Sequence, residues 1–125
     1  MNVIVEHFGG TCRTDSPDIL VETLDERDAS GLNEFVVSAD DAYPYMTILV
    51  NHTAACAHYF PADGHPGYRS WGRGGDGELF AAGSPGEMVE VDGDAIVSWE
   101  DAVDAVLEFQ RLGGAMPRRL AWREL

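Results

Sequence analysis

The sequence predicts a single domain of the α+β class, in which a mostly antiparallel, strongly twisted sheet packs against two helices. The chain has 125 residues, 45% of them hydrophobic, which is enough for one core in one domain spanning residues 1–125. Short segments of alternating apolar residues are separated by Gly- and Asp-containing turns, which is typical of antiparallel strands. Two other segments carry helix start signals and helical apolar spacing.

The first strand and the first helix are predicted near the N-terminus. Residues 2–8 alternate around β-branched side chains and predict a strand, which ends at a pair of glycines. Ser16 followed by Pro17 is typical of an N-cap with proline at the first helical position, so a helix is expected from there to about Arg27. The side chains expected to face inward are Ile19, Leu20 and Leu24.

The middle of the chain is predicted to supply most of the sheet, because the apolar period changes to two after Gly31. A tight turn at residues 51–53 is expected to join two central strands as a hairpin. Residues 92–94, Asp-Gly-Asp, predict a second hairpin, since Asp-Gly is favoured in such turns. The expected strands are 34–39, 45–51, 54–60, 68–72, 78–82, 87–91 and 95–97.

The C-terminal third predicts a second helix and a last strand. Ser98 is the expected N-cap, Asp101 stands at the capping-box position, and the helix should run to about Leu112 before a Gly-Gly stop. The apolar stripe expected at helical spacing is Ala102, Val103, Val106, Phe109 and Leu112. A closing strand is expected around Leu120 and Trp122. The aromatic residues assigned to the core are Tyr45, Phe60, Phe80, Trp99, Phe109 and Trp122.

Charge is the strongest compositional signal. There are 22 acidic against 8 basic residues, all of the latter arginine, for a net charge of −14. Residues 76–108 carry ten acids and no base, whereas residues 109–125 carry four arginines. Such a chain is not expected to bind nucleic acid, because phosphate contacts need clustered Lys or Arg. The acidity favours a basic protein partner, and solubility alone is the alternative interpretation.

No motif predicts a catalytic centre, a cofactor or a metal. The match Gly72-x-Gly74-x-x-Gly77 is interpreted as a turn, because a strand rather than a helix is expected after it. His58, Asp63 and His65 lack the spacing of zinc ligands. The H-x-E and P-C-x-x-C pattern of zinc deaminases is also missing, so the chain is not expected to be such an enzyme.

Cysteine usage and the N-terminus favour a cytoplasmic protein. Cys12 and Cys56 are too few to predict a disulfide framework, and reduced thiols are expected. No basic region followed by an apolar run opens the chain, so no secretory signal is expected.

Several segments resemble one family of immunity proteins. They are the strand-to-helix segment 95–109, the ending 117–122, and the stretches 43–45, 59–61 and 67–70. In these segments the sequence resembles the deaminase-associated immunity proteins, the first-described immunity family of bacterial polymorphic toxin systems. The resemblance implies a small, cytoplasmic, non-enzymatic inhibitor that binds a toxin encoded by a neighbouring gene. By association with the family, that toxin is expected to be a nucleic-acid deaminase, whose active site the inhibitor would occlude.

A partner surface is predicted from aromatic residues flanked by acids in loops. Tyr and Trp at a water-excluded centre carry most of the energy of an interface. The candidate partner-binding residues are Asp40, Asp41, Tyr43, Asp63, Tyr68, Trp71 and Asp76. For each aromatic residue, core packing is the alternative. A small hydrolase or ligand-binding domain is the alternative function, and self-association is left open.

Overall fold

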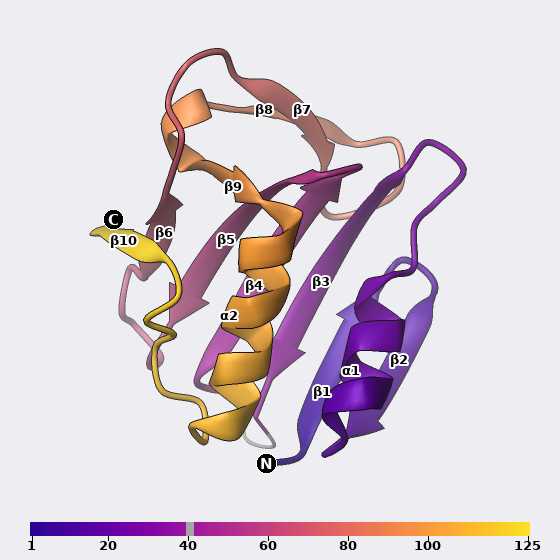
Figure 1. Ribbon diagram of the computed structural model, residues 1–125, viewed down its shortest axis with the longest axis vertical. Coiled ribbons are helices and arrows are strands. Elements are labelled where there is room, and N and C mark those ends of the chain that lie inside the picture. Colours follow the sequence, from indigo (N-terminus) through magenta and orange to yellow (C-terminus); the bar gives the residue numbers. More distant parts are fainter. Residues whose placement is uncertain (40–41) are drawn as a thin grey trace.

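One antiparallel sheet forms a layer of the molecule, and two helices form the layer beside it (Figure 1). The computed structural model describes residues 1–39 and 42–125. In these ranges the helices are α1 (Pro17–Leu24) and α2 (Trp99–Arg111), with a 3-10 turn η1 (Gly93–Ala95). The strands are β1 (Val3–His7), β2 (Gly10–Thr14), β3 (Leu32–Ser38), β4 (Tyr45–Asn51), β5 (Ala54–Phe60), β6 (Tyr68–Trp71), β7 (Glu78–Ala81), β8 (Met88–Val91), β9 (Ile96–Ser98) and β10 (Ala121–Glu124).

The main sheet has the order β10-β6-β5-β4-β3-β1-β2, and each of its described pairings is antiparallel. Strand β5 changes partner along its length. Its residues 54–56 pair with β9, and its residues 58–59 pair with β6. β7 and β8 form a separate two-stranded sheet, called the acidic hairpin below and defined as residues 76–94. The α+β class predicted from the sequence is thereby confirmed.

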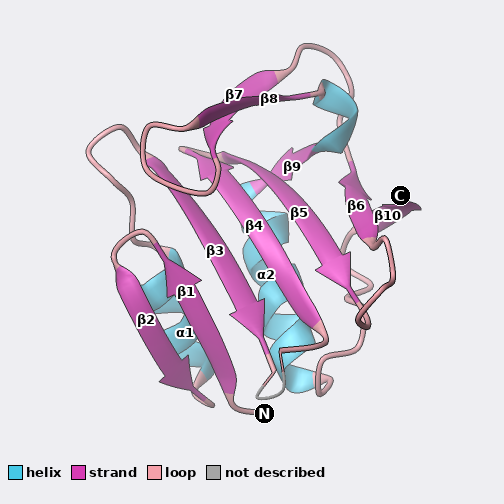
Figure 2. Cartoon of the chain, turned by 180° about the vertical axis from the view of Figure 1, so that it is seen from behind, coloured by secondary structure: helices cyan, strands magenta, loops and turns pink. Residues whose placement is uncertain are grey.

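Both helices lie on the same face of the main sheet, as the views from the two sides show (Figures 1 and 2). Each begins at a serine N-cap: Ser16 Oγ accepts from the Ile19 amide at 3.3 Å, and Ser98 Oγ accepts from the Asp101 amide at 3.1 Å. Such caps satisfy amides that the first turn leaves without a partner. Between the layers lies the main core, whose largest fully buried members include Phe35, Phe109, Leu20, Leu24, Met46 and Ile48.

The opposite face of the sheet, called the helix-free face below, is covered only at one end. There the acidic hairpin folds over β3 and β4 (Figure 2). Phe80 of β7 is fully buried against Leu49, Cys56 and Ile96, which form a second, smaller core. Two hydrogen bonds fasten the hairpin to the main sheet: Asn51 Nδ2 donates to the Leu79 carbonyl at 2.9 Å, and the Gly83 amide donates to Glu34 Oε1 at 3.0 Å.

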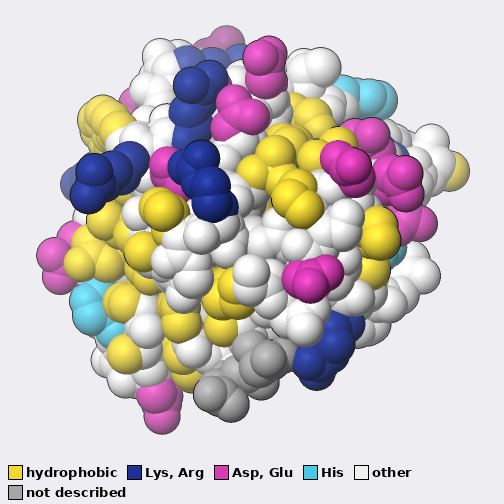
Figure 3. Space-filling view, turned by 60° about the horizontal axis from the view of Figure 1, so that its bottom comes forward, with side chains coloured by type: hydrophobic (Ala, Val, Ile, Leu, Met, Phe, Trp, Pro, Cys, Tyr) yellow, Lys and Arg dark blue, Asp and Glu magenta, His cyan; other side chains and the backbone are white. Residues whose placement is uncertain are grey.

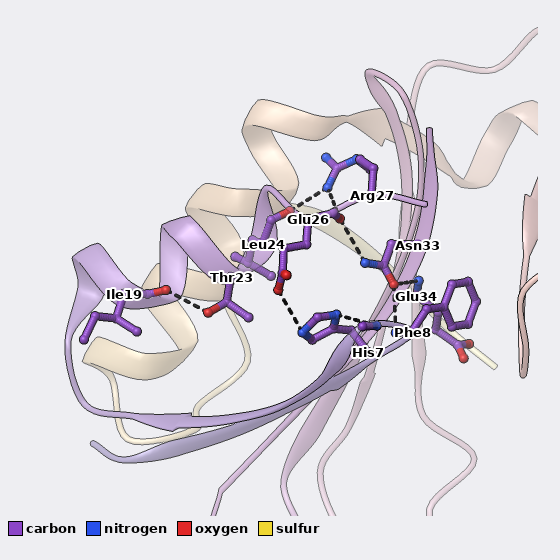
Figure 4. Close-up of polar contacts among 10 residues, drawn as sticks. His7, Phe8, Ile19, Thr23, Leu24, Glu26, Arg27, Asn33 and Glu34 are labelled. Carbon is purple, nitrogen blue, oxygen red and sulfur yellow. Dashed lines mark hydrogen bonds and ion pairs between the residues drawn. The ribbon is translucent and has the colours of Figure 1, made fainter. Parts of the chain in front are cut away.

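Polar contacts tie the segment after α1 to β1 and β3 (Figure 4), and a contact between a cation and a ring ties it to α2. His7 Nε2 lies 3.0 Å from a Glu26 carboxylate oxygen, and Asn33 Nδ2 donates to the Glu26 carbonyl at 2.9 Å. Arg27 donates to the Leu24 carbonyl at 2.6 Å and lies 4.3 Å from the centre of the Trp99 ring. The end of α1 is therefore fixed against both layers by side chains.

Most predicted elements are confirmed, including 45–51 and 54–60 to the residue, but one strand was missed and one predicted hairpin was wrong. Strand β2 was not predicted, because its polar residues show little alternation of apolar side chains. The hairpin predicted around residues 92–94 does not form, since β8 pairs with β7 and β9 pairs with β5. Residues 93 and 94 instead bind the loop before β7, where the Gly72 amide donates to Asp94 at 2.6 Å and the Gly74 amide to Gly93 at 3.1 Å.

Four side chains predicted to be buried in the core lie elsewhere. Ile19 faces solvent because α1 is short and turns Leu20 and Leu24 inward, and Leu112 is exposed because α2 ends at Arg111. Tyr45 and Phe60 are half-buried on the helix-free face rather than in the core, because both faces of β4 and β5 are apolar. Among the aromatic core predictions, Phe80 and Phe109 are fully buried, and Trp99 and Trp122 pack half-buried against the main core.

In the part of the chain that the structure describes, no helix has the length and apolar character that crossing a membrane requires.

Candidate partner-binding surfaces

The register of the strands arranges the side chains of the helix-free face in rows. Residues directly opposite each other in neighbouring strands point to the same face of a sheet. One row is formed by Ile4, Ser38, Tyr45 and Phe60. The next row is formed by Glu6, Val36, Thr47, His58, Arg69 and Arg123. This face therefore has apolar and aromatic side chains at its centre, Glu6 and Arg13 near one edge, and two arginines near the other.

Four rings lie in contact across the helix-free face. The ring centres of Tyr43 and Tyr45 are 5.2 Å apart, those of Tyr45 and Phe60 are 4.7 Å apart, and those of His58 and Phe60 are 6.0 Å apart. Tyr43, at the end of this series, is 37% exposed. A hollow of about 250 Å³ lies beside Tyr43 and Tyr45 and reaches to Glu6. The four rings thus form one continuous aromatic series on this face.

The electrostatic state of this face is set by partial burial. Burial, with a smaller effect of the Arg69 charge, lowers the pKa of His58 from its ordinary value of 6.5. His58 is thus uncharged at neutral pH, which suits its stacking with Phe60. Burial also raises the pKa of Tyr45, and the neighbouring Tyr43 adds to that shift. The centre of the helix-free face is therefore neutral at pH 7.

The acidic hairpin combines negative charge with exposed apolar side chains. Leu79 is 49% exposed, Met88 45% and Val89 40%. The carboxylates of this segment are Asp76, Glu78, Glu87, Glu90, Asp92 and Asp94. Of these six, Glu78 alone forms an ion pair with a residue that the structure describes, at 3.7 Å from Arg73. Negative charge and exposed apolar side chains therefore meet on this hairpin, and the other five carboxylates have no ion pair among the described residues.

Two of the four arginines near the C-terminus, Arg111 and Arg119, are in contrast paired with carboxylates of α2. Arg119 lies 2.9 Å from Asp101 and 3.4 Å from Asp104. Glu108 lies 3.7 Å from Arg111 and accepts from the amides of Arg118 and Arg119. Figure 3 shows dark blue arginine groups next to magenta carboxylates on this part of the surface. This neutralised network does not form a free basic patch.

The structure separates the residues predicted to bind a partner. Tyr43 is exposed on the helix-free face, and Trp71, 45% exposed, lies at an edge with Arg123 5.4 Å from its ring centre. Tyr68 points to the face that carries the helices and packs half-buried against the main core, with its ring centre 6.4 Å from that of Tyr59. Asp63 and Asp76 lie in exposed loops. Asp40 and Asp41 fall outside the described residues.

Sequence reasoning missed two parts of the accessible surface. Tyr45 and Phe60 were assigned to the core, although the alternation of β4 and β5 turns one aromatic set to each face. Leu79, Met88 and Val89 were placed in strands without being predicted as exposed. The acids beside them, Glu87 and Glu90, were the available signal.

The residues with possible metal or thiol chemistry are dispersed. Within residues 1–39 and 42–125, no three His, Cys, Asp or Glu side chains are grouped in a way that could hold a metal ion. Cys12 and Cys56 are free thiols. Burial raises the pKa of the Cys56 thiol to about 11, so it is protonated at neutral pH.

Comparisons with known proteins give two findings. A family described as Immunity protein Imm1 matches residues 10–124. The chain is also similar to the double-stranded DNA deaminase immunity protein of Burkholderia cenocepacia (strain H111). The two are 28% identical over 125 residues, which cover 96% of this chain and 98% of that protein.

Proposed function

This chain belongs to the Imm1 family of immunity proteins, and we propose that it neutralises a nucleic-acid deaminase toxin by covering the toxin's active site. The observation that carries the proposal is the family match over residues 10–124. Similarity to a double-stranded DNA deaminase immunity protein along almost the full length of both chains supports a deaminase as the partner.

The charge of the chain supports the same partner class. An enzyme that acts on DNA or RNA needs basic side chains to hold the phosphates. A protein of net charge −14 complements such a surface, and opposite charges raise the rate of encounter. An inhibitor that covers the groove also blocks access to the catalytic pocket, into which the target base must be turned.

The proposed interface combines exposed aromatic side chains with loop aspartates. Tyr43 and Trp71 are exposed and available as anchors. The four loop aspartates of the proposed interface are Asp40, Asp41, Asp63 and Asp76. Tyr68, also proposed for the interface, is half-buried.

The proposal includes the remaining properties of an inhibitor. Residues 1–125 act as one domain, supported by the sheet that joins β1 and β2 to β10. The chain acts by binding rather than by catalysis and needs no cofactor. Its place of action is the cytoplasm, where a nucleic-acid deaminase meets its substrate.

Co-purification with the toxin domain encoded by the neighbouring gene tests the proposal. The two proteins are expected to elute as one complex, and the complex should no longer bind a fluorescent oligonucleotide that the free toxin domain binds. A complex that retains oligonucleotide binding would contradict occlusion of the active site. Separate elution of the two folded proteins would contradict the proposed function itself.

A further inference from the structure

We propose that the outer edge of β8 pairs with a strand of the toxin, so that main-chain hydrogen bonds of the acidic hairpin contribute to the interface. This inference rests on the proposed function and adds to the interface proposed above a further contact region and a binding mode. It is carried by three properties that meet at β8: a free main-chain edge, exposed apolar side chains, and carboxylates that form no ion pair with a described residue.

The hydrogen bonds of the hairpin show which main-chain groups are free. The Ala82 amide donates to the Glu87 carbonyl at 2.9 Å, so residues 82 and 87 form a hydrogen-bonded pair. Such pairs alternate along an antiparallel ladder, and the register makes Phe80 and Val89 the next one. The main-chain groups of Met88 and Glu90 therefore point away from β7.

The opposite strand, β7, independently supports this alternation of inward-pointing and outward-pointing main-chain groups. Leu79 faces Glu90 in the register, so its main-chain groups should also point away from the ladder. The Leu79 carbonyl accepts from Asn51 Nδ2 at 2.9 Å, on the side where the hairpin meets the main sheet. The edge of β7 is thus occupied, whereas β8 pairs with β7 alone among the described strands.

The side chains of β8 fit an interface rather than a solvated edge. Exposed edge strands are ordinarily protected by charge, proline or a covering segment, because they are templates for pairing with another chain. Here Leu79 and Met88, which the register places on one face of the hairpin, are 49% and 45% exposed, and Val89 on the other face is 40% exposed. Exposed apolar clusters with a polar rim mark interaction sites. Adding a strand to such an edge is a known mode of recognition.

The charge of the hairpin selects the partner. Two copies of this chain paired through β8 would bring Glu87 and Glu90 of each copy together, and like charges across a strand pair are destabilising. A basic strand from a protein that holds phosphates would instead place Lys or Arg beside these carboxylates. The other edges of the main sheet lack this combination, since β2 and β10 have no exposed large apolar side chain among the described residues.

A proline substitution isolates the main-chain contribution. The Glu90 amide points away from β7, so Glu90→Pro removes one outward donor without removing a bond of the hairpin ladder. Glu90→Gln is the matched control, because it removes the same charge and keeps the amide. We expect Glu90→Pro to bind the toxin domain about tenfold more weakly than Glu90→Gln, the effect of losing about one net hydrogen bond.

Amide exchange gives a second readout that does not depend on the folding of a variant. In the free wild-type chain, the amides of Met88 and Glu90 should exchange quickly and that of Val89 slowly. In the complex with the toxin domain, the amides of Met88 and Glu90 should become protected. Unchanged exchange at both residues in the complex would overturn the inference.

The outcomes separate this inference from the proposed function. Equal affinities of Glu90→Pro and Glu90→Gln, with both variants folded by circular dichroism, would overturn strand pairing and leave the immunity role intact. A wild-type chain that does not bind the toxin domain would overturn both. A dimer of this chain that dissociates in Glu90→Pro would assign the edge to self-association and overturn the choice of partner.

Discussion

Replacing Phe109 with alanine should destabilise the chain more than any other single truncation on α2. Phe109 is fully buried in the main core, at the point where α2 meets β5. Its ring meets that of Tyr59 edge-on, with centres 6.3 Å apart, and the Tyr59 hydroxyl donates to the Gly114 carbonyl at 2.7 Å. The side chain thus supports both the helix and the segment that follows it.

The magnitude follows from the loss of a fully buried ring. Truncating a buried Phe to Ala typically costs about 3–5 kcal/mol, because the transfer energy is lost and a cavity remains. For 125 residues the entropy of unfolding near 60 °C is about 0.26 kcal/mol/K, at roughly 2.1 cal/mol/K per residue. A loss of about 4 kcal/mol then lowers Tm by about 15 °C.

Urea titration and thermal melting measure the effect, and the same helix provides the control. Leu112 is exposed just beyond the end of α2, so Leu112→Ala should change the free energy of unfolding by less than about 0.5 kcal/mol. A Phe109→Ala variant that melts within two degrees or so of wild type would refute the packing of α2 against the sheet. Equal losses in the two variants would refute it as well.

Three further predictions concern charge and chemistry. Burial lowers the pKa of His58, so unfolding takes up a proton at this residue as pH falls below about 6.5. The free energy of unfolding should therefore decrease below that pH, by at most about 1.4 kcal/mol per pH unit from this group. In urea titrations, His58→Gln should flatten this pH dependence. With a pKa of about 11, the Cys56 thiol should resist iodoacetamide at pH 8, while the partly exposed Cys12 reacts. Equal labelling of the two thiols in the native chain, measured by mass spectrometry, would contradict this. In stopped-flow experiments, raising salt from about 0.05 to 0.5 M, or neutralising the four loop aspartates, should slow association with the toxin domain. Trp71→Ala should instead mainly speed dissociation. Association that does not depend on salt would make the acidity a solubility property.

The sequence was sufficient for elements whose local signals agree with their packing. β4 and β5 combine a strict period of two with a tight turn, and their predicted bounds match the structure. The starts of both helices were predictable because Ser16 and Ser98 are capping residues whose side chains accept amide hydrogen bonds. Local chemistry decides such features, so no distant contact is needed to predict them.

Pairing and exposure depended on distant contacts and were harder to predict. The turn-like residues 92–94 bind the loop at 72–74, so the strand that follows joins β5 instead of β8. Tyr45 and Phe60 are large aromatic residues of the kind that usually lie in a core. They are accessible only because both helices lie on the opposite face of the sheet. The exposure of the apolar side chains of β8 could not be predicted, because it depends on β8 being an edge strand that pairs with β7 alone among the described strands.

The most direct test of the account is a titration of toxin activity. Deamination of an oligonucleotide by the purified toxin domain from the neighbouring gene is measured while this chain is added in increasing amounts. We expect the activity to fall in proportion to the added chain and to be abolished near one equivalent, while an unrelated deaminase stays active. Full activity of that toxin domain in the presence of excess folded chain would contradict the account.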